Sequence, residues 1–536
     1  MNNLYRRASF VRPLSAAALV LAAVSHSYAA LPFAPATPES QGVPSRAVAE
    51  WVRAMDAQGG FNGFVLLRHG RTIAEGWWRP CETNGLHMLY SLSKSFTSTA
   101  IGMLADEGNL DLDERISDLF PDKLPPAPSK NLLEMRVRDL LSMATGHEED
   151  SAPAMTQAKD DDWIKAFLAH PVPRRPGTWF RYDSGATYML SAIVRLKSGE
   201  RPSEYLAGRL FRPLGISDAR WNRSPEGEDL GGWGLNMTTR DIARFGQFWL
   251  QRGEWNGRQL LSRDYVALAS AKQISNASGP SRFEGDTVTD DWQAGYGFQF
   301  WRCTHGCYRA AGAYGQLAVI MPDQDAVLAV NSCSPMRKTL EHLWKILLPA
   351  MKDSPLPEAP EEAQELERLT ASLTRPTVKG SAAGGDFGGA FEDGVGASFS
   401  LKPSDGGWML SVTNAEWCGT VPVGFGEWRR GTVDFAADYE MLHKIPGRQT
   451  VASSGAWTAP DTFTAELFFV ETPHSTKVTI RFRGRTAVLE SRGGAKNVAA
   501  KISGHVLRAA SMGATDHPRE VEGLEYSSEP PKESRQ

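Results

Sequence analysis

Beyond its first thirty residues, the chain lacks any apolar run of the roughly 20 residues that a membrane-spanning helix needs. It also lacks a bias toward one charge, because 58 Lys and Arg are balanced by 62 Asp and Glu, for a net charge of -4. No basic stripe is present, which argues against nucleic acid as a partner. Hydrophobic residues make up 41% of the sequence and charged residues 22%, a balance typical of globular proteins. We therefore expect a soluble protein without stable membrane insertion.

Cysteine is scarce as well, with five residues in a chain of 536. An odd number leaves at least one thiol without an intramolecular disulfide partner. Cys303 and Cys307 flank a short Thr-His-Gly turn, and the sequence leaves open whether they form a local disulfide. A metal site that adds His305 is disfavoured, because no second ligand cluster with zinc spacing follows. We expect neither a metal nor a cofactor.

Residues 1–29 have the pattern of a signal peptide. A positively charged region precedes a short apolar run at 14–24, and Ser27-Tyr28-Ala29 offers small residues at the two positions that a signal peptidase reads. The charges are those of Arg6, Arg7 and Arg12. The alternative is a membrane anchor, but the run has about half the ~20 residues that a spanning helix needs. The pattern predicts cleavage after Ala29 and a periplasmic or secreted protein.

The remaining chain is too long for one ordinary core, so we expect two domains. Residues 30–353 alternate helical periodicity with short β-like runs. A proline-rich joint and a short acidic helix at 354–384 form a linker. Residues 385–512 contain many short strands separated by Gly, Asp and Asn, which predicts an antiparallel barrel or sandwich. The polar tail at 513–536 has a disordered composition.

Several elements of the first domain can be predicted individually. Residues 61–71 have the pattern of a hairpin that turns at His69-Gly70. Apolar residues at helical spacing predict a helix at 91–107, which Gly108 ends. Further predicted elements are a helix at 242–251 behind the capping box at Thr238, strands at 308–313, 317–321 and 326–330, and a helix at 342–348. Strands at both ends and helices between them indicate an α+β sheet with flanking helices and a separate helical lobe.

The strongest chemical signal is Ser91-Leu92-Ser93-Lys94. A serine hydroxyl is a weak nucleophile until a base takes its proton. Residues three apart share one face of a helix, so the Lys94 amine is expected beside the Ser91 hydroxyl. Backbone N–H groups at the helix N-terminus would help to stabilise the negative charge that develops on the substrate. This S-x-x-K pattern occurs among penicillin-recognising enzymes, although the four residues alone are a weak signal.

The surrounding sequence resembles the β-lactamase-related serine hydrolases, the superfamily of class C β-lactamases, DD-peptidases, D-aminopeptidases and certain carboxylesterases. The resemblance runs from about Thr37 to Ala350 and rests on the order and spacing of several blocks. These blocks are Met88–Thr97, Leu110–Asp113, Val137–His147, Pro176–Gly185, Gly231–Leu235 and Thr239–Gly246. It implies a β-lactamase/penicillin-binding-protein-like antiparallel sheet. The C-terminal β domain resembles the barrels, lipocalin-like in some relatives, that accompany this domain.

The resemblance assigns roles to individual residues. Ser91 matches the nucleophile, Lys94 its partner and Tyr182 a second base. Ser184 stands where the family usually has an asparagine, so its role in orienting Lys94 or the substrate is less well supported. Gly312 would let the substrate approach the strand, and the Ala313 N–H would join that of Ser91 as an oxyanion donor. Among several tryptophans, Trp233 is the best candidate for the substrate pocket.

One position departs from the family pattern. The strand beside the site usually begins its motif with Lys or His, but Ala310 stands there and supplies no cation. Arg309 is adjacent, and alternation along a strand predicts that its side chain faces the opposite way. The missing cation disfavours substrates that carry the carboxylate of penicillins. A Ser-His-Asp mechanism through His147 is also disfavoured, because no G-x-S-x-G elbow occurs.

The leading hypothesis is an exported hydrolase that cleaves an ester or small amide through a Ser91 acyl-enzyme, with Lys94 and Tyr182 sharing the proton transfers. The substrate would be a small-molecule ester, an amide or a peptide. A β-lactamase or DD-peptidase is the alternative, and a D-amino-acid amidase or aminopeptidase remains open beside the esterase. A non-catalytic binding protein is the third class, disfavoured because both Ser91 and Lys94 are present.

Overall fold

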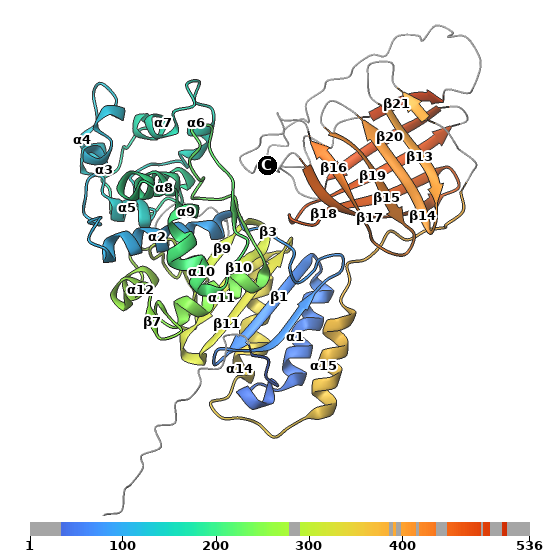
Figure 1. Cartoon of the computed structure of the whole chain (residues 1–536), viewed down its shortest axis with the longest axis horizontal. Coiled ribbons are helices and arrows are strands. Elements are labelled where there is room, and N and C mark those ends of the chain that lie inside the picture. The colour runs from blue at the N-terminus through green and yellow to red at the C-terminus, as the bar shows by residue number, and fades with distance from the viewer. Residues whose placement is uncertain are drawn as a thin grey trace, which may run out of the picture.

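The computed structural model describes residues 34–277, 290–384, 390–392, 398–413, 417–435, 448–483, 486–493 and 506–511. A layered body of helices around a sheet is joined through α15 to a C-terminal barrel (Figure 1). The predicted signal peptide at 1–29 and the predicted tail at 513–536 lie outside the described residues. Within the described ranges, no helix combines the length and the apolar character needed to cross a membrane.

The first body is built on a six-stranded antiparallel sheet in the order β2-β1-β11-β10-β9-β8. Its strands are β1 (Phe61–Arg68), β2 (Arg71–Trp77), β8 (Trp301–Arg302), β9 (Tyr308–Gly312), β10 (Gln316–Met321) and β11 (Ala326–Ser332). The predicted hairpin is confirmed, since β1 pairs with β2 across a turn in which His69 and Gly70 both have positive φ. The predicted strands after residue 307 are also confirmed, with β10 between β9 and β11.

Helices cover both faces of this sheet, so every residue of β1 is buried. Phe64 and Leu66 pack toward α1 (Ser45–Gln58) and α15 (Pro360–Ser372), whereas Val65 and Leu67 pack toward α2 (Ser93–Asp106) and α11 (Thr239–Leu250). α11 opens with the predicted capping box, in which the Thr238 hydroxyl accepts from the Asp241 N–H at 3.1 Å. The helix predicted at 342–348 instead begins six residues earlier, as α13 (Met336–His342), and continues to α14 (Leu348–Ala350).

A helical lobe lies beyond α2, on the side of the sheet opposite α1 (Figure 1). Its helices are α3 (Ile116–Leu119), α4 (Lys130–Glu134), α5 (Val137–Leu141), α6 (Ala152–Thr156), α7 (Trp163–Ala169), α8 (Ser184–Ser198), α9 (Pro202–Leu206) and α10 (Arg212–Leu214). α12 (Arg263–Ser270) and the short strands β3 (His87–Met88), β4 (Arg220–Trp221), β5 (Leu235–Met237), β6 (Glu254–Trp255) and β7 (Arg258–Gln259) complete this body. α8 packs against both α2 and α5, which brings Ser184 to the nucleophile helix.

The C-terminal strands form a closed antiparallel barrel, as the strand pattern predicts. They are β12 (Ala390–Glu392), β13 (Ser398–Ser404), β14 (Gly407–Thr413), β15 (Trp417–Gly424), β16 (Arg429–Phe435), β17 (Arg448–Ala459), β18 (Thr462–Phe469), β19 (Ser475–Arg483), β20 (Thr486–Gly493) and β21 (Val506–Ser511). β12 closes the barrel by pairing with β21. Alternate residues of β14 and β19 are buried, and they contribute to an apolar cluster inside the barrel.

The turn between β18 and β19 joins the barrel to the segment that precedes Ser91. The Met88 N–H donates to the Glu471 carbonyl at 2.8 Å, and the Tyr90 hydroxyl forms a short hydrogen bond with His474 Nε2. Tyr90 and His474 are 1% and 2% exposed, so this contact is dry. A second contact joins the Arg430 guanidinium to the Pro80 carbonyl at 2.8 Å.

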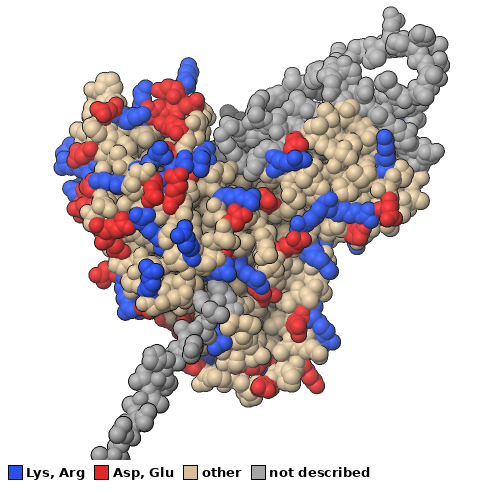
Figure 2. Space-filling model, viewed as in Figure 1, with Lys and Arg blue, Asp and Glu red and all other residues tan. Residues whose placement is uncertain are grey.

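All five cysteines are free thiols, so Cys303 and Cys307 do not form the disulfide that the sequence left open. Cys303 instead lies 3.1 Å from the Arg309 guanidinium, and the Cys307 thiol donates to the His305 carbonyl at 3.3 Å. On the face shown in Figure 2, acidic and basic side chains are interspersed over the described surface.

Candidate active site

Ser91 lies in a single turn, Tyr90–Leu92, that leads into α2. Tyr90 has φ of 51°, in the left-handed region that a bulky residue rarely adopts. Several hydrogen bonds hold this turn: the Ser93 hydroxyl donates to the Tyr90 carbonyl at 2.6 Å, and the Leu89 N–H donates to the Leu235 carbonyl at 2.8 Å. The barrel adds the bond between Tyr90 and His474. The backbone at the predicted nucleophile is therefore fixed from three sides.

Lys94 lies one turn further along, with its side chain buried. Its amine is 3.2 Å from the Ser91 hydroxyl and 3.3 Å from the Ser184 hydroxyl, and it donates to the Gly232 carbonyl at 2.7 Å. The helical spacing thus brings Ser91 and Lys94 together, and α8 adds Ser184 from a different part of the chain. An amine held among three oxygens at these distances can exchange a proton with the Ser91 hydroxyl.

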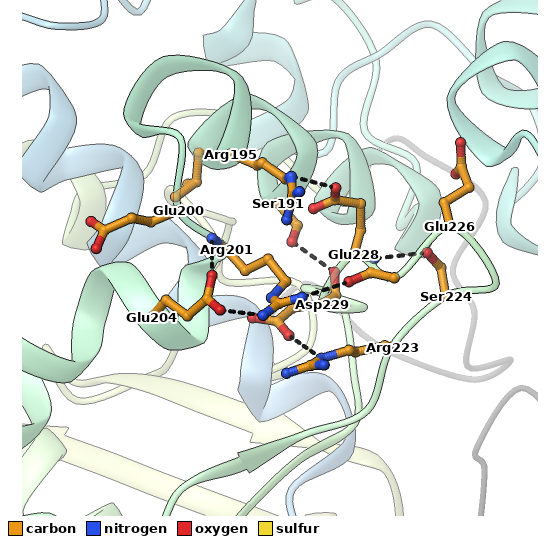
Figure 3. A network of polar contacts seen from close by, with 12 residues as sticks. Ser191, Arg195, Glu200, Arg201, Glu204, Arg223, Ser224, Glu226, Glu228 and Asp229 are labelled. Carbon is orange, nitrogen blue, oxygen red and sulfur yellow. Dashed lines mark hydrogen bonds and ion pairs between the residues drawn. The ribbon is translucent and has the colours of Figure 1, made fainter.

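The loop that carries Gly232 is anchored by a polar network in the helical lobe (Figure 3). Asp229 is fully buried, and its carboxylate accepts the Ser203 N–H at 2.7 Å, while its carbonyl accepts the Ser191 hydroxyl at 2.7 Å. Beside it, Glu228 pairs with Arg195 at 3.0 Å. These contacts fix the backbone three residues before the carbonyl that binds Lys94. The sequence block at 231–235 indicated this region, but its anchoring residues gave no sequence signal.

Tyr182 reaches the same site from the residues before α8. Its ring centroid is 5.0 Å from the Lys94 amine, and the ring stacks on Trp301 at 5.4 Å with 22° between the planes. Both Tyr182 and Ser91 line one cavity. The structure therefore brings the three predicted catalytic residues together around Lys94.

Gly312 and Ala313 lie at the end of β9, against the segment before Ser91. A Cβ on Gly312 would be 2.0 Å from the Leu89 carbonyl oxygen, so the strand can approach the nucleophile turn only with glycine here. Ala313 and Tyr314 follow, and all three residues line the same cavity as Ser91. This arrangement suits the predicted oxyanion site between the two segments.

The cavity has a volume of about 790 Å³ and is largely apolar. Trp233 lines it as predicted, together with Tyr182, Trp292, Trp301 and Tyr314. The interpretation of β9 needs a correction, because Arg309 and Ala311 line the cavity whereas Ala310 is packed in the core with α2 and α11. Alternation along the strand was correct, but the face toward the cavity was assigned wrongly.

Arg309 nevertheless presents no exposed charge. The residue is fully buried, and Trp292 and Trp301 lie over its guanidinium at 4.4 and 5.5 Å. Its Nη1 donates to the carbonyls of Asp291 and Arg302 at 3.0 and 3.2 Å. The second arginine of the cavity, Arg337, forms an ion pair with Asp290.

Two acidic residues near the site escaped the sequence interpretation. Asp150 lines the cavity, and its carboxylate accepts the N–H groups of Ser184 and Ala152 at 2.8 and 3.1 Å. Burial raises the pKa of Asp150, and the charge of Asp183 raises it further, while Lys94 opposes both. The acidic run Glu148-Glu149-Asp150 was the sequence feature that could have indicated a carboxylate in the site, but such a run more often faces solvent.

A contact with Asp183 accounts for the position of His147. The two side chains are fully buried, with His147 Nδ1 2.7 Å from the Asp183 carboxylate. The same carboxylate caps α8 by accepting the Gly185 N–H at 3.0 Å. Burial alone would raise the pKa of Asp183, but the hydrogen bonds from His147 and Ser151 lower it to about 2. His147 is thus engaged in fixing the loop beside α8, and it is not among the residues that line the cavity.

No group of three or more potential metal ligands occurs within the described part of the chain. The residues around Ser91 can instead supply a nucleophile, a base and a confined apolar space. A family model described as Beta-lactamase matches residues 48–344, more than half of the 536 residues. The chain belongs to the β-lactamase family. The match covers all of the residues discussed around Lys94.

Curated relatives differ in the substrates that their names state. The chain is 26% identical over 294 residues to a 6-aminohexanoate-dimer hydrolase of Paenarthrobacter ureafaciens. The aligned region covers 51% of this chain and 73% of that protein. It is 24% identical over 192 residues to a lovastatin esterase of Penicillium rubens, covering 32% of this chain and 48% of the esterase. The chain therefore spans less than half the length of the esterase.

Solved structures resemble the family domain. A penicillin-binding protein homologue from Caulobacter crescentus is 18% identical, with a TM-score of 0.46 over 56% of this chain and 97% of that chain. A family VIII carboxylesterase is 17% identical, with a TM-score of 0.45 over 59% of this chain and 99% of that chain.

Proposed function

We propose that the protein is an exported serine hydrolase that cleaves a small ester or amide through an acyl-enzyme on Ser91. The observation that carries the proposal is the Lys94 amine, buried and 3.2 Å from the Ser91 hydroxyl at the wall of an apolar cavity of about 790 Å³. The predicted signal peptide supports export to the periplasm or the medium.

In the proposed first step, the Ser91 oxygen attacks the substrate carbonyl carbon while Lys94 accepts the hydroxyl proton. The N–H groups of Ser91 and Ala313 stabilise the oxyanion. The proton then passes, through Lys94 or Tyr182, to the departing alcohol or amine. In the second step, water loses a proton to the same pair and attacks the ester carbonyl, which releases the acid and restores Ser91.

Ester and amide cleavage are supported by different relatives, one named an esterase and one named a dimer hydrolase. The alternative, a β-lactamase or DD-peptidase, would be favoured by an available cation for the substrate carboxylate. Arg309 is covered by two tryptophans, and Arg337 is paired with Asp290. We therefore place the ester or small amide ahead of the penicillin-type substrate.

The test uses the chain from residue 30 onward, with Ser91→Ala as the variant and Ser40→Ala, an exposed serine, as the matched control. The substrates are p-nitrophenyl butyrate, D-alanine p-nitroanilide and a chromogenic cephalosporin. A fluorophosphonate should add its mass to the protein and to Ser40→Ala but not to Ser91→Ala. Ester or anilide turnover that is lost only in Ser91→Ala supports the proposal. Turnover that survives Ser91→Ala contradicts it, and dominant cephalosporin turnover favours the alternative.

A further inference from the structure

One carboxylate occurs among the described residues that line the active-site cavity, and it belongs to Asp150. The loop before α6 carries it, and the Ser184 and Ala152 N–H groups fix its Oδ1 oxygen. Both of these bonds use one oxygen, which leaves Oδ2 available to a ligand in the cavity. The fixed carboxylate has the properties of a preorganised binding group, because no side-chain motion is needed to present it.

The charges around the cavity direct a cation toward Asp150. Within the described ranges, Asp150 forms no ion pair with a basic side chain at 4.0 Å or less. Lys94 is directed to the oxygens of Ser91, Ser184 and Gly232. Arg309 and Arg337 line the cavity, but two tryptophans cover Arg309 and Arg337 is paired with Asp290, so neither is directed at Asp150.

The same cavity provides aromatic surface for an alkylammonium group. Trp233 lines it and is 4% exposed. Tyr182 and Tyr314 contribute further rings. Aromatic faces attract cations, and an ammonium group beside a carboxylate gains from both kinds of contact.

We propose that Asp150 forms an anionic subsite that binds a positively charged amino or quaternary ammonium group of the substrate. The inference rests on the proposed function, since it names the substrate class of the same cavity. It narrows the small esters and amides to those that carry a cationic group near the reacting carbonyl.

The test compares two p-nitrophenyl esters of equal shape. One carries a 4-(trimethylammonio)butanoyl group and the other the uncharged 5,5-dimethylhexanoyl group, so only the positive charge differs. Asp150→Asn keeps the acceptor oxygen for Ser184 and Ala152 while removing the negative charge. The matched control is Asp122→Asn, at an exposed aspartate. The measured quantity is the charge preference, the ratio of kcat/KM for the charged ester to kcat/KM for the neutral ester. We expect this ratio to fall on the order of tenfold in Asp150→Asn, a loss of about 1.4 kcal/mol, and to keep its wild-type value in Asp122→Asn.

A binding measurement separates this inference from the proposed function. Calorimetry with butyltrimethylammonium, on Ser91→Ala and on the Ser91→Ala, Asp150→Asn double variant, needs no turnover. Binding to Ser91→Ala that is lost in the double variant supports the subsite even if neither ester is cleaved. In that case the proposed function is wrong and the subsite stands. If Asp150→Asn lowers kcat/KM equally for both esters and shifts the pH profile of hydrolysis, Asp150 acts on Lys94 and not on the substrate charge. That result would overturn the inference. Ester turnover without charge preference, combined with no calorimetric binding, would overturn it as well.

Discussion

The contact between Tyr90 and His474 predicts that the barrel helps to hold the nucleophile turn. Tyr90→Phe removes one hydroxyl from a buried pair and leaves the aromatic ring in place. Burial raises the pKa of Tyr90 well above its ordinary value, so a neutral hydroxyl forms the hydrogen bond with His474 Nε2. Losing such a buried hydrogen bond costs about 1–3 kcal/mol. Because Tyr90 precedes Ser91 and has a positive φ, part of this cost should appear as lower kcat/KM.

The assay is a double-mutant cycle on ester hydrolysis and on urea unfolding. Tyr90→Phe and His474→Leu are measured alone and together, and we expect a coupling energy of about 1–2 kcal/mol. Tyr308→Phe is the matched control, since its buried hydroxyl donates to the Trp249 carbonyl at 3.2 Å, away from the barrel. The control should lower stability without coupling to His474. Additivity of Tyr90→Phe and His474→Leu to within about 0.5 kcal/mol would refute the reasoning.

Three further predictions follow from single residues. Gly312→Ala should lower kcat/KM by about 100-fold or more, because a Cβ would lie 2.0 Å from the Leu89 carbonyl oxygen and would displace the strand from the nucleophile turn. Circular dichroism should show that the fold is retained. Near-normal kinetics would contradict this prediction. Burial lowers the pKa of His87 to about 4, so as the pH falls the unfolded chain takes up a proton on His87 before the folded protein does. The free energy of unfolding should therefore fall by about 3 kcal/mol from pH 6.5 to 4. Urea midpoints should show this loss in the wild type but not in His87→Gln. Asp229→Ala removes the carboxylate that accepts the Ser203 N–H and so loosens the loop that holds Gly232, away from the cavity. We expect kcat to fall more than KM rises, and an unchanged kcat would argue against that role.

Much of the fold could be predicted from the sequence wherever the local pattern of residues agrees with the tertiary packing. The turn at His69-Gly70, the capping box at Thr238 and the strands of the barrel all appear as local patterns, and the structure confirms them. The helix that begins at Met336 was placed six residues too late, although Met336, Leu340 and Leu343 already have helical spacing, and Pro335 is the residue that precedes its first turn. Such boundaries depend on where the preceding strand ends, which a local pattern does not contain.

The sequence by itself predicted the contact between Ser91 and Lys94, through the S-x-x-K spacing in a chain whose other blocks resemble the family, because residues three apart on a helix share one face. It also indicated Tyr182 and Gly312, through a resemblance between blocks, and Trp233, as one of several tryptophans that could line a pocket. Only the tertiary structure decided which face of β9 lines the cavity, that two tryptophans cover Arg309, and that Asp150 lines the same cavity as Ser91. The reason is physical: helical spacing is local, whereas the charge that a cavity presents depends on side chains brought together from distant segments.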